Sequence, residues 1–157
     1  MKWLTTLFLS FFSIGFIPGI EGTLASAVSL PIIAQLFLLL PADQPNRILA
    51  YGSVIVVLVG FGTVAIRHCK KIPKKDCDQS FIVIDEVTGM MVALLPLMMA
   101  SEFSWRLSLI AFLLFRFFDI VKPLGIRKID QMNTPLSVML DDVVAGLYSA
   151  ALLWILF

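Results

Sequence analysis

The chain has 157 residues, of which 59% are hydrophobic, and its mean hydropathy is +0.96. Ordinary soluble domains contain only about 45–50% apolar residues, so the composition indicates an integral membrane protein. The formal net charge of +1, without a patch that combines basic and aromatic residues, gives no support for nucleic-acid binding. The length predicts a single domain over residues 1–157, and it is expected to be helical because no stretch alternates apolar and polar residues as a barrel strand does.

The N-terminal apolar run covers residues 3–17 and follows Lys2. It has the character of a signal peptide, but a second apolar stretch comes soon after it, so cleavage would still leave a membrane protein.

The next loop, residues 17–26 (IPGIEGTLAS), is rich in turn-forming residues. Gly19 and Gly22 predict a turn, and Thr23 or Ser26 could cap the helix that follows. A helix N-terminus behind a glycine turn offers free N–H groups to an anion such as phosphate, although a plain turn between helices explains the same residues.

Two uncharged segments, residues 24–40 and 48–66, are long enough to cross a bilayer. The loop at 67–79 that follows them is strongly basic, and by the positive-inside rule it faces the cytoplasm. With Lys2 also on the cytoplasmic side, an even number of crossings must precede Arg67, and these two segments supply it. Residues 3–17 are then a re-entrant or interfacial helix that does not cross. The basic residues of the loop are Arg67, Lys70, Lys71, Lys74 and Lys75.

The same loop contains His68, Cys69 and Cys77, which are the chain's only histidine and cysteines. A structural zinc site needs about four such ligands, so we expect free thiols in place of a metal site. A mechanism that requires two histidines is excluded.

Pairs of carboxylates begin two of the later apolar segments. Asp85 and Glu86 lie near the start of residues 81–101, and Asp141 and Asp142 open the last apolar segment, each pair with small residues one turn further on. An acidic pair can simply complement a helix dipole, but apolar residues precede Asp85 directly, which favours a functional role. Small residues permit close helix packing and leave space beside the acids.

A third charged group lies between these pairs. Arg116, Asp119 and Lys122 are three residues apart, which places them on one face of a helix that Pro123 ends or bends. A charge at membrane depth costs roughly 2.5–3.5 kcal/mol, so charges retained there are expected to have a function. On the predicted topology all three groups lie near the cytoplasmic surface.

Carboxylates gathered in a medium of low dielectric need cations. Oxygen ligands favour Mg²⁺, which commonly binds a few carboxylates, water and substrate phosphate. The residues therefore predict metal-assisted phosphoryl chemistry, with Lys122 or Arg116 binding the phosphate. The candidate carboxylates are Asp85, Glu86, Asp119, Asp141 and Asp142.

Four motifs together resemble the phosphatidylglycerophosphatase A family, in order and approximate spacing over about residues 15–155. They are IPGIEGTLAS, IVIDEVTGM, FRFFDIVKPLGIRKID and VMLDDVVAG. The resemblance implies an all-α membrane bundle around a central helix, in a bacterial inner membrane with its site facing the cytoplasm. It also implies a Mg²⁺-dependent enzyme that removes the terminal phosphate of the phospholipid phosphatidylglycerophosphate. By position, the five carboxylates would be metal-binding or catalytic. Arg116 and Lys122 would bind phosphate, and Gly19, Gly22 and Thr23 would form the loop that meets it.

The chain departs from the family pattern at three places. Ile20 replaces a threonine of the first loop, Gly125 replaces a proline after Lys122, and residues 133–137 replace a glycine-rich run. None of these changes removes a carboxylate, but they affect how the headgroup is held. Two other functions remain open: a small transporter that couples ions through its carboxylates, and an inactive relative that only binds lipid.

Overall fold

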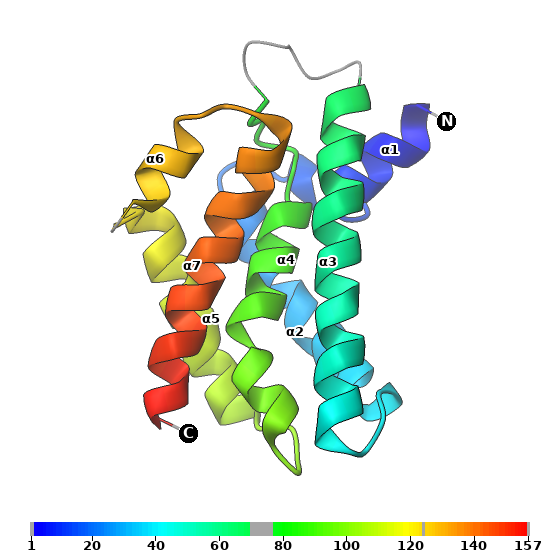
Figure 1. The fold of residues 1–157 in the computed structure, drawn as a ribbon. Helices are drawn as coiled ribbons and strands as arrows, with labels where there is room; N and C mark the ends of the chain where they lie inside the picture. The colour runs from blue at the N-terminus through cyan, green and yellow to red at the C-terminus, as the bar shows by residue number, and fades with distance from the viewer. Residues whose placement is uncertain (1, 70–76, 124, 157) are drawn as a thin grey trace.

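The computed structural model describes residues 2–69, 77–123 and 125–156, and in these residues it contains helices and no strand (Figure 1). The predicted all-α class is therefore confirmed. Lys70, Lys71, Lys74 and Lys75 lie outside the described residues. The elements in chain order are α1 (Lys2–Leu9), η1 (Ile14–Phe16), α2 (Glu21–Leu39), α3 (Gln44–His68), α4 (Ile84–Ala93), η2 (Leu95–Met99), α5 (Trp105–Val121), α6 (Ile126–Asp130) and α7 (Pro135–Leu156).

Helix α4 is the centre of the bundle. It contacts α2, α3, α5 and α7, which surround it in Figure 1. Every residue of α4 except Glu86 is buried. A helix that is buried on all sides must be apolar on all sides, and IDEVTGMMVA satisfies this requirement except at its acidic start. The central helix implied by the family resemblance is therefore present.

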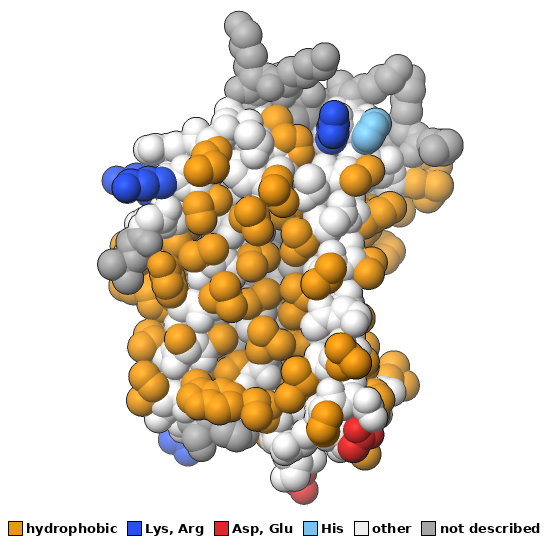
Figure 2. All heavy atoms as spheres, viewed as in Figure 1, with side chains coloured by type: hydrophobic (Ala, Val, Ile, Leu, Met, Phe, Trp, Pro, Cys, Tyr) orange, Lys and Arg blue, Asp and Glu red, His pale blue; other side chains and the backbone are white. Residues whose placement is uncertain are grey.

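Within the described part of the chain, three helices are long and apolar enough to cross a membrane: α2, α3 and α7. Hydrophobic side chains cover the middle of the face shown in Figure 2, and the charged side chains lie toward its two ends. Helix α1 has eight residues and cannot cross, in agreement with the re-entrant or interfacial helix predicted at the N-terminus. The chain is a helical membrane protein.

Helices α4 and α7 cross in very close contact because both carry a glycine at the crossing point. A Cβ atom on Gly146 would lie 2.4 Å from the carbonyl oxygen of Gly89. A Cβ atom on Gly89 would lie 2.6 Å from the ring of Phe115 and 2.7 Å from the carbonyl oxygen of Asp142. The predicted role of small residues in close packing is confirmed, and the acid-bearing turns of both helices are held next to each other.

Two helices begin earlier than the sequence suggested. Helix α2 begins at Glu21, so the prediction that Thr23 or Ser26 caps it is wrong, and Thr23 instead lies in the first turn. Helix α7 begins at Pro135, a residue favoured at the first helical position. Thr134 and Ser137 form reciprocal side-chain to backbone hydrogen bonds of 3.0 and 2.8 Å around that start. As a consequence, Asp141 and Asp142 lie inside α7 and not at its N-terminus.

The end of the bundle remote from α1 is closed by Arg47. Its guanidinium donates to the carbonyl oxygens of Pro41, Ala42 and Ala100 at 2.9, 2.8 and 2.7 Å. It also stacks on the ring of Phe37, 4.4 Å from the ring centroid. This buried cation joins the α2–α3 turn to the segment that follows η2.

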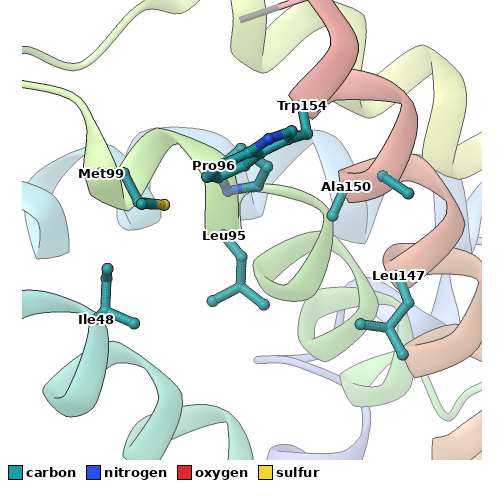
Figure 3. A pocket seen from close by; sticks show the side chains of 8 residues that line it. Ile48, Leu95, Pro96, Met99, Leu147, Ala150 and Trp154 are labelled. Atoms are coloured by element: carbon teal, nitrogen blue, oxygen red, sulfur yellow. The ribbon is translucent and has the colours of Figure 1, made fainter.

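An apolar pocket of about 330 Å³ opens at this same end of the bundle, between α3, η2 and α7. Figure 3 shows Trp154 next to Pro96, with Leu95 and Leu147 lining the space. Its lining contains no charged residue, so this pocket has no group that could bind phosphate.

Candidate functional site

The predicted site residues gather at the end of the bundle opposite Arg47. They come from the start of α2, the start of α4, the C-terminal part of α5 and the first half of α7 (Figure 1). Segments that are far apart in the sequence thus meet at one end of the membrane domain.

Asp85, Glu86 and Asp142 form a compact carboxylate cluster. One oxygen from each lies within 4.8 Å of the others. Asp85 and Asp142 are buried, and an Asp85 oxygen accepts the backbone N–H of Glu86 at 3.1 Å. The close contact between Gly89 and Gly146, one turn further along each helix, holds the two acidic turns together.

The cluster fits a divalent cation. Three negative charges at this spacing repel one another, and burial strengthens the repulsion. The Oε2 atom of Glu86 is buried and has no hydrogen-bond partner among the described residues. Oxygen-only ligands are those preferred by Mg²⁺ and other hard cations. Asp85, Glu86 and Asp142 are therefore the residues that could hold such an ion.

Arg116 supplies positive charge beside this cluster. Its Nη1 atom lies 2.8 Å from Asp119 Oδ2, an i,i+3 ion pair on α5 that confirms their predicted common face. The contact is not aligned as a hydrogen bond. Neither Nε nor Nη1 has a hydrogen-bond partner among the described residues. The planar guanidinium therefore retains donors suited to phosphate.

A small polar pocket of about 210 Å³, here called the anion pocket, lies between the start of α2 and Arg116. A Cβ atom on Gly22 would lie 2.1 Å from Glu86 Oε1 and 3.3 Å from Arg116 Nη1, so only glycine allows this approach. Gly19 adopts φ +88°, a conformation that glycine tolerates and other residues rarely adopt. The pocket is lined by Gly19, Ile20, Glu21, Gly22, Thr23, Glu86 and Arg116.

Lys122 is paired with two carboxylates outside the anion pocket. It ends α5 in the left-handed region, with φ 48° and ψ 53°, and its Nζ donates to Asp130 at 2.6 Å and to Asp141 at 2.7 Å. Burial alone would lower the pKa of Lys122, but the hydrogen bonds to Asp130 and Asp141 raise it above its usual value. Lys122 does not line the anion pocket. The structure thus separates the five candidate carboxylates into a cluster of three, a partner of Arg116 and a partner of Lys122.

Sequence reasoning did not single out Glu21 or Asp130. Asp130 is the last residue of the short helix α6. The residue before this helix, Gly125, has φ +96°. Proline cannot adopt this φ, so the departure at Gly125 belongs to a turn built differently from the family pattern. The sequence signal for Glu21 was its position inside the glycine loop, where no other charged residue stands.

The fold and the site together define a class of protein: a helical membrane protein with a buried carboxylate cluster beside an anion pocket. The profile of the phosphatidylglycerophosphatase A family matches residues 7–157. The chain belongs to the phosphatidylglycerophosphatase A family and is a phosphoric monoester hydrolase.

Similar proteins support this membership. A protein of Bacteroides thetaiotaomicron, provisionally named phosphatidylinositol-3-phosphatase, is 37% identical over 90% of this chain and 86% of its own length. Phosphatidylglycerophosphatase A of Escherichia coli K12 is 30% identical over 91% of this chain and 77% of its own. The Haemophilus influenzae protein of that name is 41% identical over 46% of this chain and 43% of its own. No solved structure matches the chain.

Proposed function

We propose that the protein is a Mg²⁺-dependent lipid phosphatase that hydrolyses the terminal phosphomonoester of phosphatidylglycerophosphate to give phosphatidylglycerol. The observation that carries the proposal is the anion pocket, in which the unpartnered donors of Arg116 meet the edge of the carboxylate cluster at Glu86. Two relatives named phosphatidylglycerophosphatase A support the choice of substrate.

In this proposal, different residues of the site bind the phosphate and the metal ion. Arg116 and the loop at Gly19, Gly22 and Thr23 hold the phosphate, with Asp119 orienting the guanidinium. Asp85, Glu86 and Asp142 hold Mg²⁺, which when bound neutralises charge on the phosphate and on the carboxylates. Lys122 fixes Asp141 beside its neighbour Asp142 by a hydrogen bond of 2.7 Å.

The chemical step is the attack of water on phosphorus. A new P–O bond forms, the bond between phosphorus and the headgroup oxygen breaks, and a proton passes to the departing alcohol. The products are inorganic phosphate and a lipid alcohol. Arg116 lies where it can stabilise the negative charge that develops on the phosphoryl oxygens, which is commonly a large term in phosphoryl transfer.

We further propose that the site faces the cytoplasm from a bacterial inner membrane. Arg67 lies in the last turn of α3 at the site end of the bundle, and Arg127 and Lys128 lie on α6 at the same end. An excess of Lys and Arg on one side of a membrane domain favours the cytoplasmic side.

The proposal is tested by phosphate release from phosphatidylglycerophosphate in detergent, first with Mg²⁺ and then with EDTA. We expect release that depends on Mg²⁺ and is abolished in Asp142→Asn and Asp85→Asn. Glu102→Gln, an exposed change in the turn between η2 and α5, is the matched control and keeps full activity. Full Mg²⁺-dependent activity in the two folded aspartate variants would contradict the proposal.

A second substrate is favoured by a specific observation. The Bacteroides relative that covers 90% of the chain is provisionally named for phosphatidylinositol 3-phosphate, and Ile20 changes the lining of the anion pocket. The same assay with both lipids decides between them by kcat/KM. Ion flux in sealed vesicles tests the transporter alternative, and absence of turnover on every lipid phosphate would favour the inactive relative.

A further inference from the structure

We infer that Glu21 is a specificity-determining residue that accepts hydrogen bonds from hydroxyl groups of the lipid headgroup, an inference that rests on the proposed phosphatase function. Glu21 is the first residue of α2 and lines the anion pocket together with Arg116 and Glu86. Its Oε2 atom is buried and has no hydrogen-bond partner among the described residues. An acceptor buried without a donor is costly, so the pocket presents a position that a ligand donor can satisfy.

The chemistry of the pocket selects hydroxyl groups over phosphate at this position. An ionised carboxylate only accepts hydrogen bonds, and phosphate oxygens are negatively charged acceptors that it repels. The guanidinium of Arg116 lines the same pocket, and its Nε and Nη1 donors, which make no hydrogen bond among the described residues, suit the phosphate. A carboxylate in the first turn also complements the helix dipole, but the dipole supplies no donor to Oε2.

The size of the anion pocket determines how close the headgroup hydroxyls lie to Glu21 when Arg116 binds the phosphate. Because the anion pocket has a volume of only about 210 Å³, a phosphate bound by Arg116 brings the adjacent headgroup atoms close to Glu21. Phosphatidylglycerophosphate carries a free hydroxyl next to its terminal phosphate, and a phosphorylated inositol ring carries several. Phosphatidic acid carries none. Glu21 therefore favours polyol headgroups over phosphatidic acid.

The test compares kcat/KM of the full-length protein on phosphatidylglycerophosphate, phosphatidylinositol 3-phosphate and phosphatidic acid. Glu21→Leu removes the acceptor, and Glu21→Gln keeps an acceptor but removes the charge. In Glu21→Leu we expect the ratio of kcat/KM for a polyol lipid to that for phosphatidic acid to fall by about tenfold or more, the value of a hydrogen bond to a charged group. In Glu21→Gln we expect this ratio to fall by less, and the control Glu102→Gln should keep the wild-type ratio.

Three results would overturn the inference. Unchanged kcat/KM on all three lipids in Glu21→Leu would show that the headgroup hydroxyls do not meet Glu21. An equal loss on all three lipids would assign Glu21 to the common chemistry or to the cation. If the wild-type protein releases phosphate from none of the three lipids, the proposed function itself fails, and the preference fails with it.

Discussion

Replacing Gly22 by alanine tests the site without changing any charge. The added Cβ would lie 2.1 Å from Glu86 Oε1, and ordinary contact begins at about 3.4 Å, so the Glu86 carboxylate must move by roughly 1 Å. A misplacement of about 1 Å in a catalytic constellation can reduce turnover by about 100-fold. Alanine has the higher helix propensity, so the thermal midpoint should not fall by a comparable amount.

The assay is Mg²⁺-dependent phosphate release, with the thermal midpoint measured on the same protein. Gly52→Ala is the matched control, because a Cβ on that α3 glycine meets nothing within 4 Å, and it should keep wild-type activity. A Gly22→Ala protein with wild-type activity would refute the view that Glu86 and the glycine loop form one site. A loss of activity together with unfolding would refute the claim that the change acts on the site alone.

Two further predictions concern the ionic groups. Lys122→Met leaves the Asp130 and Asp141 carboxylates without their cation, and because these side chains are only partly buried we expect roughly 1–2 kcal/mol lower stability in denaturant unfolding. Because those hydrogen bonds raise the pKa of Lys122, this contribution is present below its usual pKa of 10.5 and is lost only at higher pH. The difference between wild type and variant should therefore be equal at neutral and mildly alkaline pH, and a difference that vanishes there would contradict the ion pair. Mg²⁺ should raise the wild-type thermal midpoint, since a ligand that binds the native state stabilises it, and Asp142→Asn should abolish this shift. An equal shift in both proteins would place the cation elsewhere.

Much of the architecture could be predicted because strong physical constraints leave clear sequence patterns. Uncharged segments of bilayer length predicted α2 and α3, and acids next to apolar runs singled out Asp85, Glu86 and Asp142, which the structure brings into one cluster. The glycine loop and Arg116, which are far apart in the sequence, do meet in one pocket. These residues could be predicted because a charged or turn-forming residue stands out in the sequence of an apolar membrane segment.

The remaining features depend on backbone geometry that the pattern does not encode. Regular spacing placed Lys122 on the face of Arg116, but the helix ends there with a left-handed residue, and Lys122 turns to Asp130 and Asp141. The early start of α7 depends on the local hydrogen bonds between Thr134 and Ser137, whose side chains are individually unremarkable in sequence.

The Arg47 cluster joins the segments at the end of the bundle opposite the anion pocket. A path through the protein would have to separate a buried guanidinium from three carbonyl oxygens and from the ring of Phe37. The anion pocket and the Arg47 cluster lie at opposite ends of the bundle. Under the proposed function, a lipid headgroup is hydrolysed at one end of the bundle only, so the reaction changes the lipid composition of one leaflet.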